Sequence, residues 1–470
     1  MNLEQADAVA IATAVRERKV SAVEVTKAAL QRIAARDEEL NCFTTVTAET
    51  ALAEAERIDG EVAQGKNPGS LAGVPFAVKN LFDVAGLTTL AGAKINSENP
   101  PATQDATAVA RLKQAGAVLV GVLNMDEYAY GFVTENFHYG VTRNPHDLKR
   151  IAGGSSGGSA AALAAGLVPL TLGSDTNGSI RVPAALCGVF GFKPTYGRLS
   201  RAGVALFSSS LDHIGPFARS VRDIATTFDV LQGEDEKDPV CTKRPCEPCL
   251  PQLNQDIADL RIAIAGDYFI NGANPEALEA VQKVADALGV TQYVTIPEAD
   301  RAKAAAFVIT ACEGANLHLE KLRSPKASPA GASRLQDFDP ATRDRFLAGA
   351  LIPGNWYVQA QRFRRWYRDK VRQIFQKVDV ILAPTTPISA PLIGQQTMIL
   401  NGEEILVRPH LGLYTQPLSF IGLPVLSVPI QSSNALPLGV QLIAAPYNEA
   451  LILQVAALLE TKGVTLAPLV

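Results

Sequence analysis

Residues 150–216 limit what this chain can fold into more than any other part of the sequence, because they are rich in glycine and serine and yet apolar. The stretch includes IAGGSSGGSAAALAAGLVPLTLGSDTNGSIR and carries few charges. Flexible linkers are also rich in glycine and serine, but they lack the apolar component. We therefore predict that this stretch is no linker and that its backbone passes close to another group.

The composition narrows the classes of protein to consider. The chain has 470 residues, of which 47% are hydrophobic, and a formal net charge of −4. So many apolar residues exclude a disordered chain and suffice for a large core. The small acidic charge argues against nucleic-acid or membrane-surface binding. Glu4 and Asp7 stand where a signal peptide would be basic, and no apolar run is long enough for a membrane span. We expect a cytoplasmic protein.

The order of predicted elements favours an α/β fold. Residues 1–66 are expected to form a helical layer, with Ser21 and Glu24 as a capping box. Residues 67–470 are expected to form one domain against which that layer packs. A predicted helix at 106–115 precedes a continuous apolar run at 117–125, which is typical of a strand buried on both faces. Further strands are predicted at 260–269, 378–387, 423–430 and 438–446, and further helices at 275–288, 341–377 and 448–462.

Several familiar sites do not fit this sequence. Cys241, Cys246 and Cys249 lie in CTKRPCEPCL without a nearby histidine, which favours a proline-rich loop over a zinc site. The GGSSGG segment lacks the lysine of a phosphate-binding loop. None of the five histidines falls into a Ser/His/Asp pattern. A serine hydrolase built on this chain could instead use a lysine as its base, because burial lowers the pKa of an amine.

One lysine and two serines are candidates for such chemistry. Lys79 lies among apolar residues in GVPFAVKNLF, Ser155 lies in GGSSGGS before a predicted helix, and Ser179 lies in GSDTNGSIR. Taken singly, they are more typical of a surface lysine, a helix cap or turn, and a polar turn than of catalytic residues. Their sequence context decides between these interpretations.

Residues 153–195 resemble the amidase signature family. The family pattern is a Gly/Ser-rich stretch, then D-x-G-G-S-I-R, then P-A-x-x-C-G-x-x-G-x-K-P-T. This chain has GGSSGGSA, DTNGSIR and PAALCGVFGFKPT, and the segment around Lys79 matches the family's G-V-P-x-x-x-K-N. The resemblance covers nearly the whole chain. It implies a central mixed β-sheet covered by helices on both faces, and amide hydrolysis without a metal or organic cofactor.

The resemblance also implies roles for individual residues. Ser179 would be the nucleophile, Ser155 the bridging serine after a cis peptide bond, and Lys79 the terminal base of a Ser-Ser-Lys triad. The oxyanion hole would consist of the backbone amides of Thr176, Asn177, Gly178 and Ser179. Asn177 replaces the first glycine of the family pair, which leaves the amide in place. An inactive scaffold of this fold would have lost a triad residue, and all three are present.

The substrate is indicated by further segments, including LNMDEYAYGFVTENFHYG, AAAFVITACEGANLHLEKLR and PLGVQLIAAPYNEAL. They resemble one subgroup of the family, the catalytic subunits of 1-carboxybiuret hydrolases in cyanuric acid breakdown. That resemblance implies an anionic, biuret-like substrate, release of ammonia, urea-1,3-dicarboxylate as product, and a small accessory subunit in a hetero-oligomer. The alternatives are the glutaminase subunit of a tRNA-dependent amidotransferase, which shares NMDEYAYGFVTEN, or another small-amide amidase.

Three residues are predicted to bind the substrate. Arg345, in RDRFLAG, matches the position at which amidotransferase subunits hold the substrate carboxylate. Tyr128 and His318 are expected to line the pocket.

Overall fold

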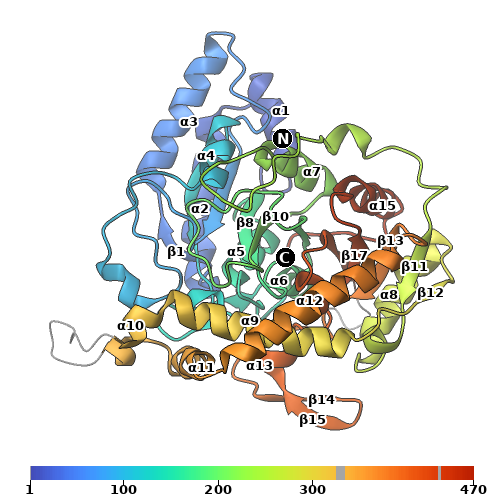
Figure 1. Cartoon of the computed structure of the whole chain (residues 1–470). Helices are drawn as coiled ribbons and strands as arrows, with labels where there is room; N and C mark the ends of the chain where they lie inside the picture. Colours follow the sequence, from blue (N-terminus) through green and yellow to red (C-terminus); the bar gives the residue numbers. More distant parts are fainter. Residues whose placement is uncertain (1, 324–333, 432–435) are drawn as a thin grey trace.

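The chain folds around one large mixed β-sheet (Figure 1). The computed structural model describes residues 2–323, 334–431 and 436–470. Within these ranges the large sheet has eleven strands. In spatial order they are β1 (Phe43–Val46), β3 (Val118–Leu123), β2 (Pro75–Lys79), β8 (Leu170–Asp175), β10 (His213–Ala218), β9 (Phe190–Lys193), β16 (Val425–Gln431), β17 (Pro437–Ala444), β13 (Val380–Pro384), β11 (Ile262–Ala265) and β12 (Tyr293–Val294). Short antiparallel pairs are β4 (Glu135–Asn136) with β5 (Gly140–Val141), β6 (Arg143–Asn144) with β7 (Asp147–Ile151), and β14 (Thr397–Leu400) with β15 (Glu403–Leu406).

Both faces of the sheet are covered. Every residue of the central strands β2, β8, β10 and β17 is buried, and successive side chains of a strand point to opposite faces. The predicted α/β class is confirmed.

No helix in the described ranges combines the length and apolar character needed to cross a membrane. The α-helices are α1 (Ala8–Arg16), α2 (Ala22–Leu40), α3 (Ala48–Ala63), α4 (Thr107–Gln114), α5 (Gly157–Ala164), α6 (Arg181–Cys187), α7 (Val221–Leu231), α8 (Pro275–Leu288), α9 (Ala299–Leu317), α10 (Leu319–Arg323), α11 (Pro340–Ala350), α12 (Gly354–Ile374), α13 (Val407–His410), α14 (Gln416–Ser419) and α15 (Glu449–Thr461).

The first 66 residues are less uniform than the sequence pattern indicates. The predicted capping box opens α2, where Ser21 Oγ accepts the Glu24 amide at 3.0 Å and the Ser21 amide donates to Glu24 Oε2 at 2.8 Å. However, residues 43–46 form strand β1, which pairs antiparallel with β3 at the edge of the sheet. A strand of four residues is too short to show a period, so the pattern missed it.

One predicted helix is two helices in the structure. The stretch predicted as a single helix over 341–377 is divided into α11 and α12, with a break after Ala350 and Pro353 at the start of α12. Proline has no amide hydrogen and disfavours helical geometry in the residue before it, which explains the break. Helices α9, α11 and α12 lie together on the lower side of the molecule in Figure 1, and the β14–β15 hairpin extends below them.

The topology places the candidate residues at one edge of the sheet. β2 and β8 are parallel neighbours, so their carboxyl ends, Lys79 and Asp175, lie on the same side. The chain leaves β8 through residues 176–180 and enters α6, while Ser155 and Ser156 directly precede α5. Two Gly/Ser-rich turns and the end of β2 therefore meet at this edge.

Candidate active site

Lys79 is a buried amine held between two serines. Its Nζ donates to Ser155 Oγ at 2.6 Å and to Ser174 Oγ at 2.9 Å. Lys79 and Ser155 are both 0% exposed, so the surface-lysine interpretation does not apply. Burial lowers the pKa of Lys79 to about 7, against the opposing effect of the Asp126 and Asp212 carboxylates. Near neutral pH a large share of the Lys79 side chains is therefore neutral.

The backbones of the two serine-containing turns lie side by side. The peptide bond between Gly154 and Ser155 is cis, and the Ser156 amide donates to the Ser179 carbonyl oxygen at 3.3 Å. Asp126 packs against this peptide, because its amide donates to the Ser155 carbonyl oxygen at 3.2 Å. A Cβ on Gly154 would lie 2.1 Å from Asp126 Oδ2. This agrees with the prediction that the Gly/Ser-rich backbone passes close to another group.

Residues 176–179 form a turn whose amides are free. None of these four backbone N–H groups makes a hydrogen bond to any residue that the structure describes. The turn itself is fixed from both sides, since Thr176 Oγ1 donates to Asp212 Oδ1 and Thr415 Oγ1 donates to the Asn177 carbonyl oxygen, each at 2.6 Å. Gly178 has a φ of +139°, and a Cβ there would lie 2.1 Å from Thr415 Oγ1. The arrangement presents free donors on a rigid backbone, as an anion-binding turn requires.

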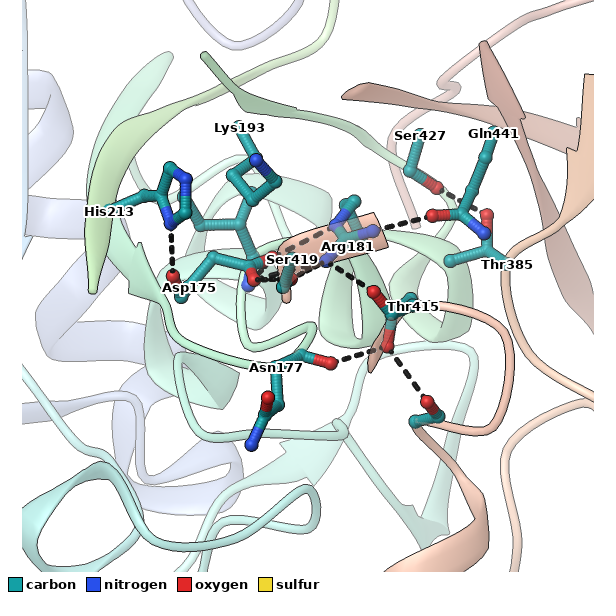
Figure 2. Close-up of polar contacts among 12 residues, drawn as sticks. Asp175, Asn177, Arg181, Lys193, His213, Thr385, Thr415, Ser419, Ser427 and Gln441 are labelled. Carbon is teal, nitrogen blue, oxygen red and sulfur yellow. Dashed lines mark hydrogen bonds and ion pairs between the residues drawn. The ribbon is translucent and has the colours of Figure 1, made fainter. Parts of the chain in front are cut away.

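A buried ion pair supports this turn from behind, as Figure 2 shows. Arg181 Nε donates to Asp175 Oδ2 at 3.0 Å, and both side chains are fully buried. Arg181 also donates to Gln441 Oε1 at 2.6 Å and to Ser419 Oγ. Burial alone would raise the pKa of Asp175, but the Arg181 guanidinium holds that pKa well below its usual range. The pair therefore stays ionised and braces the turn.

Removing Arg181 should destabilise the fold strongly. Arg181→Leu leaves the Asp175 carboxylate buried without its partner, which typically costs about 3–5 kcal/mol in the free energy of unfolding. Arg57, half exposed and paired with Glu54 and Glu61, is the matched control. Arg57→Ala should cost less than about 1 kcal/mol. Urea denaturation of both variants measures the difference, and equal losses would contradict a bracing role for Arg181.

Ser179 opens into a cavity of about 370 Å³. The aromatic side chains of Tyr130, Phe132, Phe207 and Phe307 form much of its wall. The cavity is also lined by polar and charged residues, namely Thr176, Asn177, Ser179, Arg345, Arg408 and Gln416. A small cavity with an apolar wall and a few convergent polar groups is typical of a site for a small molecule.

The predicted Arg345 does reach this cavity. Its guanidinium lies over the Tyr130 ring, 4.0 Å from the ring centroid, and its Nε donates to the Ala341 carbonyl oxygen at 2.9 Å. Burial lowers the pKa of Arg345. Within the described part of the chain, Arg345 forms no salt bridge, although the Asp126 and Asp339 carboxylates act on it from a distance and raise its pKa. A partly buried cation that no carboxylate contacts directly can bind an anionic ligand.

Arg408 also lines the cavity, and no sequence pattern pointed to it. It follows the β14–β15 hairpin and forms an ion pair with Glu135 at 3.0 Å. Burial would lower the pKa of Arg408, but nearby carboxylates, Asp126 and Glu135 among them, raise it. Arg408 lies in no recognisable motif, so only the folded chain brings it to the site.

Tyr128 and His318 were expected to line the pocket, and the structure places them elsewhere. Neither is among the residues that line the cavity. Their rings pack against each other with centroids 4.0 Å apart, and His318 also packs on Phe346 at 4.9 Å. Burial lowers the pKa of His318 to about 3. They belong to an aromatic cluster that supports Tyr130 from behind, since Phe346 packs on Tyr130 at 5.4 Å.

The cysteine cluster forms no metal centre in the described ranges. Cys241, Cys246 and Cys249 are free, with Cys246 exposed and Cys249 buried. Among the residues described, no three His, Cys, Asp or Glu side chains come together in a way that could hold a metal ion.

Comparison with known proteins shows which family the chain belongs to. Residues 24–453 match the Amidase family model. The chain is 54% identical to AtzE, a 1-carboxybiuret hydrolase subunit of Pseudomonas sp. (strain ADP), over 95% of this chain and 96% of that protein. It is 41% identical to a glutamyl-tRNA(Gln) amidotransferase subunit of Roseiflexus sp. (strain RS-1), over 93% and 92% of the two chains.

A solved structure is similar to this chain over nearly its whole length. The chain superposes with a TM-score of 0.95 on a chain of an inhibitor-bound vestigial protein complex, which was described as revealing the evolutionary origins of an s-triazine catabolic enzyme. The two are 52% identical, and the match covers 98% of this chain and 100% of that one. The chain therefore belongs to the amidase signature family and is an amidohydrolase.

Proposed function

We propose that this amidohydrolase deaminates 1-carboxybiuret, which with water gives urea-1,3-dicarboxylate and ammonia. The observation that carries the proposal is the Arg345 guanidinium, which forms no salt bridge with any described residue and shares a cavity with Ser179. A substrate with a carboxylate at one end and a terminal amide at the other can bridge the two. The 54% identity to a 1-carboxybiuret hydrolase subunit supports this choice.

The proposed catalytic relay runs from Ser179 through Ser155 to Lys79. The ionised Lys79 amine donates to Ser155 Oγ at 2.6 Å, and the neutral amine has a lone pair that can accept a proton over the same distance. Ser179 Oγ attacks the terminal amide carbon while its proton passes to Ser155, whose own proton passes to Lys79. The C–N bond then breaks, the relay returns a proton to the nitrogen, and ammonia leaves.

The second half of the reaction uses the same groups. A water molecule loses a proton to the relay and attacks the acyl group on Ser179, which releases the carboxylate product and restores the serine. The free amides of residues 176–179 are the proposed oxyanion hole for both tetrahedral intermediates. Their position on a fixed turn means that they need no reorganisation when negative charge develops. No step requires a metal or an organic cofactor.

Arg345 should distinguish an anionic substrate from a neutral one. Arg345→Ala should raise KM for 1-carboxybiuret by about tenfold or more, because a charge-assisted hydrogen bond is lost. KM for biuret, which lacks the carboxylate, should change less than about twofold. Arg343→Ala is the matched control, since Arg343 lies on the same helix but pairs with Asp344 at 2.8 Å. Equal changes for both substrates would remove Arg345 from carboxylate binding.

The glutaminase subunit of a tRNA-dependent amidotransferase remains the second candidate, because this chain is 41% identical to one amidotransferase subunit.

The 1-carboxybiuret proposal also includes a small accessory subunit, which the solved vestigial protein complex supports. We propose a cytoplasmic hetero-oligomer that contacts no nucleic acid directly.

Ammonia release by the purified chain, with and without its candidate partner, tests the proposal. A cyanuric acid hydrolase would generate 1-carboxybiuret in place, with glutamine and simple amides assayed in parallel. We expect release from the cyanuric acid coupled reaction. Release from glutamine alone would favour the amidotransferase alternative, and release from simple amides alone would place the enzyme in another branch of the family.

A further inference from the structure

Gln416 is a buried amide that the fold leaves without a partner. It is the first residue of α14, lines the same cavity as Ser179 and is 1% exposed. Neither Gln416 Nε2 nor Gln416 Oε1 makes a hydrogen bond to any described residue. Buried side-chain amides are nearly always hydrogen-bonded, because burying one without a partner destabilises the protein. An exception inside a cavity points to a ligand.

Gln441, close to this site, shows how the same fold treats a structural glutamine. Gln441 is 0% exposed, and its Oε1 accepts Arg181 Nη1 at 2.6 Å (Figure 2). Its Nε2 donates to the carbonyl oxygens of Pro384 at 2.9 Å and Tyr414 at 3.2 Å. Every polar atom of that side chain is used. The free amide of Gln416 is therefore not a general feature of this region.

A second unpartnered oxygen lines the same cavity. Asn177 Oδ1 is buried and accepts no hydrogen bond from any described residue. Together, Asn177 and Gln416 offer two acceptors and one donor group in the cavity that Ser179 also lines. Simple acyl chains cannot satisfy them, because a methylene neither donates nor accepts. A ligand that does so must bring hydrogen-bond donors and an acceptor, as the N–H and carbonyl groups of a biuret-like substrate do.

We propose that Gln416, together with Asn177, binds the –CO–NH–CO– link of the substrate and makes the enzyme specific for N-acyl ureas over amides linked through carbon. This inference rests on the proposed deamination of 1-carboxybiuret and assigns the group that recognises its middle. The bridging N–H donates to Gln416 Oε1, and the distal carbonyl accepts from Gln416 Nε2. A carbon-linked amide such as malonamide keeps the distal carbonyl but has no bridging N–H, so it leaves Gln416 Oε1 unpaired, which a site of this kind rejects.

Biuret and malonamide form the matched substrate pair, since they differ only by N–H against CH₂ between the two carbonyls. The informative variant is Gln416→Met, which keeps the length of the side chain and removes the amide. We expect it to lower kcat/KM for biuret by about 10- to 100-fold and for malonamide by less than about threefold. Gln359→Met, at an exposed position of α12, is the control and should change neither value.

Two further measurements separate recognition from a structural role. The melting temperature of Gln416→Met should stay the same or rise, because an unpaired buried amide is replaced by an apolar group. In the inactive Ser179→Ala background, biuret should raise the melting temperature and malonamide should not, and Gln416→Met should abolish that difference. A fall in melting temperature together with equal losses on both substrates would overturn the inference, as would unchanged kinetics.

The same data distinguish this inference from the proposed function. If the wild type cleaves 1-carboxybiuret but Gln416→Met affects biuret and malonamide equally, the function stands and the assignment of Gln416 is wrong. If the wild type does not cleave 1-carboxybiuret but binds biuret over malonamide through Gln416, the function is wrong and the assignment stands.

Discussion

Ser179→Ala should lower kcat for 1-carboxybiuret by at least about 10⁴-fold, because the oxygen that forms the acyl-enzyme is removed. Substrate affinity should change little. The cavity walls remain, and Ser179 itself is only one of the lining residues. Ammonia release measures the rate, and calorimetric titration with biuret measures affinity. The contrast between lost turnover and kept binding is the expected signature of a nucleophile.

The control for this experiment is Ser97→Ala. Ser97 lies at the surface, where its Oγ donates to the Lys94 carbonyl oxygen at 2.7 Å, and it is not among the residues that line the cavity. Its replacement should leave kcat unchanged. Turnover by Ser179→Ala above about one hundredth of the wild-type rate would mean that another group attacks the amide. Mass spectrometry of acid-quenched wild-type enzyme should show the acyl adduct on the peptide that contains Ser179.

Lys79→Met should lower kcat by about 10³- to 10⁴-fold, because Ser155 then has no base to take its proton. The pH profile shows which protonation state of Lys79 is active. The relay needs neutral Lys79, and burial lowers the pKa of Lys79 to about 7. Wild-type kcat/KM should therefore fall about tenfold per pH unit below that value and level off above it. Stopped assays of ammonia between pH 5 and 9 measure this profile.

Lys113→Met is the matched control, because Lys113 is partly exposed and pairs with Asp105 at 2.8 Å. It should keep both the rate and the profile. In Lys79→Met, the residual activity should lose the step near pH 7. If that step persisted at the wild-type position, another titrating group would be the base.

Local sequence was enough for much of the fold. Continuous apolar runs mark strands such as β3 and β13, because a strand buried on both faces needs apolar residues at every position. Capping chemistry marks the start of α2. The predictions from the sequence pattern were wrong where the structural feature is too short or too irregular to show a period. The two cases are the four-residue strand β1 and the helix break before Pro353.

The candidate site, like the fold, was predictable from the sequence only in part. Its anchors, Lys79, Ser155 and Ser179, lie in segments whose unusual composition is visible without a structure, because turns that approach other backbone closely require glycine. That Lys79 is buried and within 2.6 Å of Ser155 follows from the parallel pairing of β2 with β8 and from the entry into α5.

Only the tertiary structure decided which side chains meet the substrate cavity. Arg345 reaches it and Tyr128 does not, although both come from segments with equally suggestive sequences. Arg408 and Gln416 reach it from segments with no motif at all. The physical reason is that the hydrophobic periodicity of a helix or strand indicates only which side of that element a residue occupies. The side chains that the residue contacts come from other elements, which can be hundreds of residues away in the sequence. Whether a buried amide is hydrogen-bonded depends on those contacting side chains, and they cannot be predicted from the spacing of residues in the sequence.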